Sequence, residues 1–204
     1  YVIPAVIFTI VSSTLTAYGF GRFKFFGRSV LFAILMSTLF LPQVVLNVPQ
    51  YIMYNIFGWV GSKLYLPLIV PSMFATETYF VFMLIQFLRN IPKELEEAAK
   101  IDGCNEIQTL IKVIVPMLKP ALVSCALFKF MWASNDFLGP LLYVNNPAKY
   151  PATIFVKLAM DSDAGFAWNR ILSTSLISIL PSIIIFFIAQ NQFVEGISAG
   201  GVKG

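Results

Sequence analysis

The sequence predicts an all-α protein that crosses a membrane several times, because of its composition and the length of its apolar runs. Hydrophobic residues make up 58% of the 204 residues, charged residues make up 12%, and the mean hydropathy is +0.79. A soluble domain carries about 25% charged residues. The apolar residues also gather in runs of about 20, the length that an α-helix needs to cross the hydrocarbon core. We therefore expect a polytopic bundle of transmembrane helices.

These runs define one transmembrane domain over residues 1–204, with approximate spans at 2–20, 30–48, 64–88, 121–144 and 171–193. The first span contains no charged residue. The outer end of the second span is interrupted by four residues that disfavour a lipid-facing helix: Pro42, Gln43, Asn47 and Pro49. Membranes tolerate such a break where the backbone packs on other helices or lines a cavity, so we expect this end to face the bundle.

The last three spans also contain residues that are unusual in a plain membrane helix. The third carries two prolines and Glu77, the fourth carries Lys129 and Asp136, and the fifth is interrupted by Pro181. A polar, turn-rich loop at residues 145–170 separates the fourth span from the fifth. A second polar segment, residues 89–119, separates the third from the fourth.

The distribution of basic residues predicts the topology. Lysines and arginines number nine on one side: Arg22, Lys24, Arg28, Arg89, Lys93, Lys100, Lys112, Lys119 and Lys203. The opposite side has four: Lys63, Lys149, Lys157 and Arg170. Because cytoplasmic loops carry the excess of lysine and arginine, we expect segment 89–119 and the C-terminus in the cytoplasm. Tyr1 would then begin outside, which implies at least one further span upstream.

The composition also excludes several classes of function. Histidine is absent, and the two cysteines are Cys104 and Cys125, so we expect no catalytic residues, no histidine-based catalysis and no metal site. The sequence has no glycine-rich phosphate loop, so any ATP would be hydrolysed by another chain. It has no basic stripe with interleaved aromatic residues, so we expect no nucleic-acid partner.

Segment 89–119 predicts two short helices joined by a turn. Pro92 suits the first turn of a helix, and three glutamates follow it where the helix dipole favours anions. Gly103 accepts the left-handed conformation that ends such a helix. Asn105 and Gln108 have the spacing of a capping box for the second helix, which we expect to end near Pro116. Helices this short must be held by packing on other elements.

The same residues resemble a known signature. Glu97-Ala98-Ala99, three residues, Gly103, nine residues and Val113-Ile114-Val115-Pro116 together resemble the EAA signature of ABC-importer permease subunits. The flanking Ile91-Pro92, Glu94-Leu95 and Ile101-Asp102 are similar to the maltose-type, carbohydrate-importing branch. The resemblance extends over essentially the whole chain, including residues 132–141 and 196–204. Departures are small: Val113, Val115 and Gly201 replace residues that are common in that family.

The resemblance implies the function and the partners. The full protein would have six spans in the plasma membrane of a bacterium or an archaeon, surrounded by lipid, and would form half of the translocation path for a sugar or oligosaccharide. Its partners would be a second, homologous permease subunit, a cytoplasmic ATPase dimer that holds ATP and Mg²⁺, and an extracytoplasmic solute-binding protein. This chain itself would bind no cofactor. Segment 89–119 would form the coupling helices, with these contact residues: Glu94, Glu97, Ala98, Ala99, Asp102, Gly103 and Pro116.

Polar residues within the spans are candidates for the substrate path: Glu77, Lys129, Trp132, Asn135 and Asp136. A charge inside the bilayer costs about 2.5–3.5 kcal/mol on insertion scales, so it usually faces a cavity or a partner. The spacing i, i+3, i+7 predicts that Lys129, Trp132 and Asp136 share one helix face. A ring, a carboxylate and an amide suit a sugar. Packing between subunits or helices, and a Lys129 that reaches the membrane surface, are the alternatives.

Two other transport functions remain possible from the sequence. An ion-coupled secondary transporter would use Glu77 or Asp136 as a proton or cation site. An ABC importer for glycerol phosphate or a polyol would share the same signature. A membrane enzyme is excluded by the lack of a nucleophile paired with a base.

Overall fold

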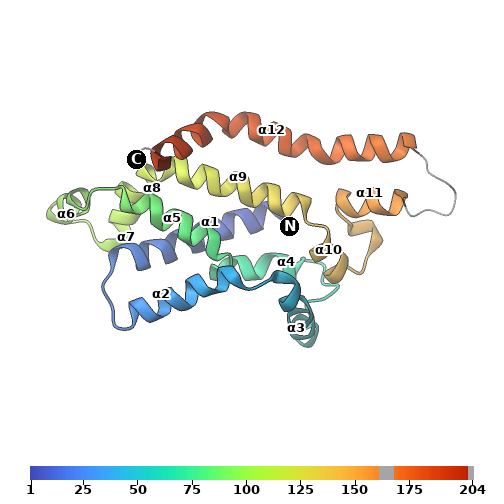
Figure 1. The fold of residues 1–204 in the computed structure, drawn as a ribbon, viewed down its shortest axis with the longest axis horizontal. Coiled ribbons are helices and arrows are strands. Elements are labelled where there is room, and N and C mark those ends of the chain that lie inside the picture. Colours follow the sequence, from blue (N-terminus) through green and yellow to red (C-terminus); the bar gives the residue numbers. More distant parts are fainter. Residues whose placement is uncertain (161–167, 202–204) are drawn as a thin grey trace.

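The structure, a computed structural model, describes residues 1–160 and 168–201. Every regular element in these residues is helical: α1 (Val2–Arg22), α2 (Arg28–Ser37), α3 (Gln43–Ile56), α4 (Leu66–Ile69), α5 (Thr78–Arg89), α6 (Glu94–Ile101), α7 (Glu106–Thr109), α8 (Val115–Met117), α9 (Lys119–Asn135), α10 (Leu138–Tyr143), α11 (Ala152–Met160) and α12 (Trp168–Gly201). The helices lie roughly along one long axis, with α6 at one end of the bundle and α11 near the other (Figure 1).

Three stretches of the described residues are long and apolar enough to cross a membrane as they stand: α1, Leu66–Arg89 and α12. Two further pairs of helices are bent at a short break, and if each pair counts as one span the total rises to five. One pair comprises Arg28–Phe40 and Gln43–Ile56, at 103°, and the other comprises Glu106–Met117 and Lys119–Asn135, at 78°. The prediction of an all-α, polytopic bundle is confirmed.

The predicted second span, 30–48, is divided between two helices. The chain leaves helical geometry at Leu41, which is extended (φ −78°, ψ 119°), and α3 starts after Pro42 in a new direction. The cause is local, because a proline disfavours the helical conformation of the residue before it and has no N–H to continue the hydrogen-bond ladder. The break therefore lies where the prolines predicted one, and it turns the chain sharply.

The predicted third and fourth spans are also interrupted. In the third, Ala75 has a positive φ of 52° and Glu77 is not helical, so α5 begins only at Thr78. In the fourth, α9 ends at Asn135, and Asp136 is extended (φ −66°, ψ 121°) before α10 starts. Both breaks place a carboxylate at the end of a helix inside an otherwise apolar stretch.

The core lies between α1, α5 and α9, which contact one another along the bundle. Phe80, Leu84 and Leu88 on α5 are fully buried, and Cys125 on α9 packs in the same cluster. The cluster continues to Ile114, which comes from the π-helical turn Leu110–Ile114 that follows α7. The segment 94–117 is thus joined to the membrane helices through the same core.

Much of the remaining apolar surface is exposed. Helix α12 lies alongside α9 and α11, yet only 6% of its most apolar window is buried within the chain (Figure 1). No residue of α2 is buried. Such surface is suited to lipid and to other membrane subunits. The predicted outer loop and tail lie partly outside the described residues, at 161–167 and 202–204.

Candidate functional site

The predicted helix pair of segment 89–119 forms a hairpin at one end of the bundle. We call residues 94–109 the α6–α7 hairpin; α6 is the outermost element at that end (Figure 1). Gly103 has φ +84°, and the N–H of Cys104 donates to the carbonyl of Ala99 at 2.9 Å. The N–H of Gly103 donates to the carbonyl of Lys100 at 3.0 Å. These bonds complete a glycine-ended helix terminus of the Schellman type, as the sequence predicted.

The cap predicted for the second helix is also confirmed. The Asn105 side chain accepts a hydrogen bond from the Gln108 N–H at 2.9 Å, and the Gln108 side chain accepts one from the Asn105 N–H at 2.9 Å. This reciprocal pair fixes the start of α7 directly after the Gly103 turn. The helical segment ends at Met117, directly after Pro116, as we expected, although Pro116 itself lies in the short helix α8.

A buried ion pair anchors the hairpin to the end of α1. The Arg22 Nε and Glu96 Oε1 atoms lie 2.5 Å apart, and both side chains are about nine-tenths buried. Arg22 also donates to the carbonyl of Ile91 at 2.7 Å. Burial raises the pKa of the Glu96 carboxyl, and the neighbouring guanidinium of Arg22 opposes that rise. The sequence analysis missed this anchor, although Glu96 lies three residues before the buried Ala99 and so shares its helix face.

A second set of contacts holds α7 against α6 and α1. Lys100 and Glu106 form an ion pair at 2.7 Å, and Tyr18 donates to Glu106 at 3.4 Å. The hydrogen bond to Glu106 raises the pKa of the exposed Lys100. The two helices of the hairpin, α6 and α7, are therefore linked to each other and to the membrane helix α1.

The predicted coupling residues divide into two groups. Ala99 is buried and faces the bundle, where its small side chain permits close packing. The other coupling residues are exposed: Glu94, Glu97, Ala98, Asp102, Gly103 and Pro116. Three apolar side chains of the hairpin are exposed as well: Leu95, Ile101 (86% exposed) and Ile107 (68%). The outer face of the hairpin is thus an exposed surface of mixed acidic and apolar side chains.

Two of the intramembrane charges, Glu77 and Lys129, pair with each other. Lys129 on α9 is buried and forms an ion pair with Glu77, at the break before α5. Thr9 on α1 donates to the other carboxylate oxygen of Glu77 at 3.4 Å. In this geometry Lys129 is directed to Glu77, which is the bonding between helices that we gave as an alternative to the substrate path.

The prediction that Asp136 shares a helix face with Lys129 and Trp132 is wrong, because α9 ends one residue earlier. Asp136 instead accepts a hydrogen bond from the Gly139 N–H at 3.1 Å and so caps α10. Asn135 is exposed and donates to the carbonyl of Met131 at 2.8 Å. The prediction assumed a continuous helix through Asp136, but α9 ends at Asn135.

Trp132 lies in an aromatic group between α5 and α9. Its ring centroid is 5.3 Å from that of Tyr79 and 5.1 Å from that of Phe80, and half of the side chain is exposed. The side chain thus remains partly accessible beside these rings. Its stacking on a sugar stays a prediction.

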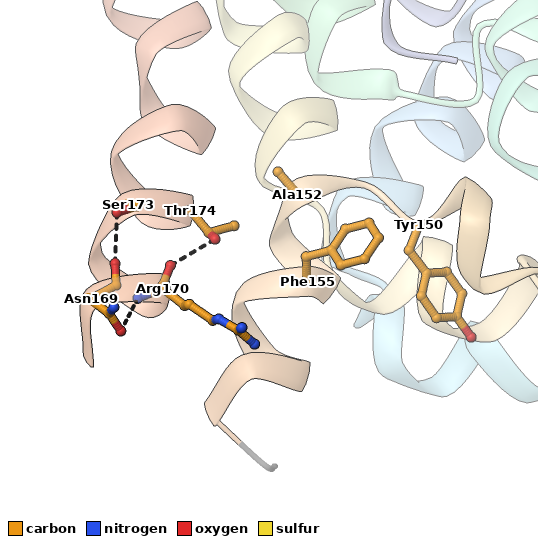
Figure 2. Close-up of a pocket in the computed structure, with 7 residues that line it drawn as sticks. All are labelled: Tyr150, Ala152, Phe155, Asn169, Arg170, Ser173 and Thr174. Carbon is orange, nitrogen blue, oxygen red and sulfur yellow. Dashed lines mark hydrogen bonds between the residues drawn. The ribbon is translucent and has the colours of Figure 1, made fainter. Parts of the chain in front are cut away.

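A wide, shallow cavity lies at the opposite end of the bundle, between α11 and the start of α12. Its volume is about 710 Å³. Tyr150 and Phe155 line one side, and Arg170 and Thr174 line the other (Figure 2). The sequence analysis did not identify this group, because its halves are separated by a loop. Among the described residues, no cluster of three or more potential metal ligands is present.

Comparisons with known proteins give the family. The family described as binding-protein-dependent transport system inner membrane component matches residues 1–197. The trehalose/maltose transport system permease protein MalG of Thermococcus litoralis is 31% identical over 196 residues, which is 96% of this chain and 70% of that protein. The osmoprotective compounds uptake permease protein GgtD of Synechocystis is 34% identical over 98% of this chain and 67% of that protein.

A solved structure shares the fold. A chain of a bacterial ABC transporter involved in the import of the acidic polysaccharide alginate superposes with a TM-score of 0.78, at 22% sequence identity, over 95% of this chain and 71% of that chain. The chain belongs to the family of inner-membrane components of binding-protein-dependent transport systems, and it is a permease subunit of an ABC importer.

Proposed function

We propose that this permease subunit forms half of a translocation path for a sugar or oligosaccharide, and that its α6–α7 hairpin couples the path to a cytoplasmic ATPase. Relatives named for trehalose and maltose, alpha-glucosides and arabinooligosaccharides support the substrate class. The partners in this proposal are a second permease subunit, an ATPase dimer that holds ATP and Mg²⁺, and a solute-binding protein. The C-terminus and the hairpin lie in the cytoplasm.

The anchored hairpin is the observation that carries the proposal. Its outer face exposes Ile101 and Ile107, while its inner face is fixed to α1 by the ion pair of Arg22 with Glu96. Because the hairpin is held rigidly on α1, a force applied to its outer face can move α1, and with it the core of α5 and α9. A loosely held loop would absorb the same movement. The arrangement therefore suits the transfer of a conformational change between a soluble subunit and the membrane bundle.

The substrate path in this proposal runs along the break region of α5 and α9. Trp132 offers a half-exposed ring, Glu77 at the break before α5 pairs with Lys129 of α9, and Asp136 lies at the break that follows α9. Broken helices inside a membrane are stable where they are buried in protein or line a cavity. Half of the path would come from the second permease subunit.

Co-purification tests the proposal. The protein, expressed with its genomic neighbours and extracted in mild detergent, should carry an ATPase and a second permease, and its uptake should require ATP. Ile101→Ser should weaken recovery of the ATPase at least fivefold. Lys24→Ser, an exposed change in the loop that precedes α2 at the same end, is the matched control and should recover it normally.

Two results would count against the proposal. Uptake that survives ATP depletion but stops when ion gradients are collapsed would establish an ion-coupled transporter. Equal recovery of the ATPase with wild type and with Ile101→Ser would show that the hairpin does not form the contact with the ATPase. If a polyol or glycerol phosphate competed for uptake and saccharides did not, the substrate class would be corrected while the coupling role remained.

A further inference from the structure

A second cavity lies at the hairpin end of the bundle, between the end of α1, the start of α2 and the end of α5. Its volume is about 250 Å³, and it is more enclosed than the cavity at α11. At its wall, α1 and α5 pack closely, because a Cβ on Gly21 would collide with the Leu88 side chain. The sequence analysis used the basic residues of this region only to orient the chain.

Three arginines line this cavity, Arg22, Arg28 and Arg89, and none of the other described residues that line it is acidic. Arg22 is already neutralised by Glu96. Arg28 forms no ion pair among the residues that the structure describes, and Arg89 donates only to the uncharged Gln86, at 3.4 Å. Two positive charges thus converge on one cavity without a countercharge, which favours an anion.

The start of α2 adds to this preference. Gly27 precedes the helix with φ +77°, and no side chain caps the N–H groups of the first turn. Ser29 in that turn lines the cavity. Uncapped N–H groups and the helix dipole both favour a negative group beside them.

The remaining walls are apolar and continue onto lipid-facing surface. Phe20 and Phe32 line the cavity, and Phe26 next to it is fully exposed. Helix α2 runs away from the cavity with no buried residue, and its exposed side chains include Leu31 and Ile34. A free anion would use none of this surface. A phospholipid would place its phosphate in the cavity and its acyl chains along α2.

We propose that this cavity binds the phosphate headgroup of an anionic phospholipid such as phosphatidylglycerol. Arg28 and Arg89 contact the phosphate, Ser29 donates a hydrogen bond to it, and the phenylalanines and α2 contact the acyl chains. Basic pockets between membrane helices are known to bind such headgroups. The bound lipid would link α2 to α5 beside Arg22, the residue that anchors the hairpin. The inference needs only that the chain lies in a membrane, so it stands or falls separately from sugar transport.

Native mass spectrometry of the purified permease complex tests this site. The probes are dioleoyl phosphatidylglycerol and, for comparison, dioleoyl phosphatidylcholine and inorganic phosphate. Wild type should retain phosphatidylglycerol in preference to phosphatidylcholine. Arg28→Gln with Arg89→Gln should lower its affinity about 25-fold, since each basic residue near a lipid surface contributes about fivefold. Lys24→Gln, which removes the same charge outside the cavity, should lower it less than twofold.

Two further variants keep the test decisive if the double variant is poorly folded. Ser29→Glu adds a negative charge at an exposed position of the cavity and should abolish the preference for phosphatidylglycerol. Arg28→Lys with Arg89→Lys keeps both charges and should retain most of the affinity. An equal loss of affinity for phosphatidylglycerol in Lys24→Gln would overturn the proposal, because it would show that general surface charge, and not this cavity, attracts the lipid. Competition by millimolar inorganic phosphate would overturn the lipid as occupant and leave a small-anion site.

Discussion

Arg22, the last residue of α1, and Glu96, on the coupling hairpin, form a buried ion pair although 74 positions separate them in the sequence. The two atoms are 2.5 Å apart, and the Arg22 guanidinium also holds the carbonyl of Ile91. The membrane bundle and the hairpin are therefore joined by a charge pair and the apolar core behind it. The pair is the structural link between the membrane helices and the surface that we propose meets the ATPase.

The first prediction concerns this pair. Because burial favours the neutral form of Glu96, Glu96→Gln, which resembles that form, should change the thermal unfolding midpoint in detergent only slightly. Arg22→Met leaves Glu96 buried without its guanidinium partner and should lower the midpoint clearly. The double change, Arg22→Met with Glu96→Leu, should recover most of that loss, because burial already disfavours both charges. Additive losses in the double variant would show that the two residues act independently.

The pH dependence of stability follows from the pKa of Glu96. Burial raises this pKa above its ordinary value of 4.5, so the folded state binds the proton more tightly than the unfolded state does. Its contribution to stability is then complete below pH 4.5 and is lost as the pH rises through the raised value. Across that interval the unfolding midpoint of wild type should fall relative to that of Glu96→Gln. Parallel curves for the two proteins would assign the pH dependence to other groups.

The turn of the hairpin gives a graded prediction at Gly103. Its φ of +84° costs a residue with a Cβ about 1–2 kcal/mol, yet nothing lies within 4 Å of an added Cβ. Gly103→Asn should therefore retain coupling. Gly103→Pro cannot reach this φ and loses the hydrogen bond to Lys100, so substrate should no longer stimulate ATP hydrolysis. Gly19→Ala, in open space on α1, is the control; a Gly103→Pro complex that couples normally would remove the turn from the mechanism.

Local signals in the sequence were sufficient for the hairpin. Gly103 and the pair Asn105 and Gln108 each predict a backbone conformation that needs only a few neighbouring residues, and each adopts it. The same holds for the break at Pro42. Length and composition were likewise enough to indicate membrane helices, because the bilayer imposes both.

Contacts between distant segments were not predictable from local pattern. The pairing of Arg22 with Glu96 and that of Glu77 with Lys129 depend on how α1, α5 and α9 pack. Helix α9 ends at Asn135, where Asp136 accepts a hydrogen bond from the Gly139 N–H, and the following Gly139-Pro140 did not fix the exact residue at which the helix stops. The prediction that Lys129 and Asp136 share a helix face therefore assumed that α9 extends to Asp136, which it does not.

Trp132 and Asp136 give a prediction about the substrate path. Trp132→Ala removes the half-exposed ring and should reduce uptake at least tenfold while the complex still assembles; Trp132→Phe should retain part of it. Asp136→Ala also removes the cap of α10, at a cost of about 1 kcal/mol. Asp136→Asn removes the charge but keeps an oxygen that can accept the capping hydrogen bond, so it distinguishes the effect of the charge from the effect of the cap. Normal uptake by both Trp132→Ala and Asp136→Asn would exclude these side chains from the path.

The intramembrane pair of Glu77 and Lys129 tests whether those charges serve structure or transport. Glu77→Gln should leave Lys129 buried and unpaired, and should lower the yield of folded protein and its unfolding midpoint. Glu77→Leu with Lys129→Met replaces both charges by apolar groups of similar size and should restore the folded yield. Thr9→Val, which removes only the 3.4 Å hydrogen bond to Glu77, should have a small effect. If the double variant folds and transports, the pair is structural; if it folds but does not transport, the charges belong to the path, because stability can no longer explain the loss.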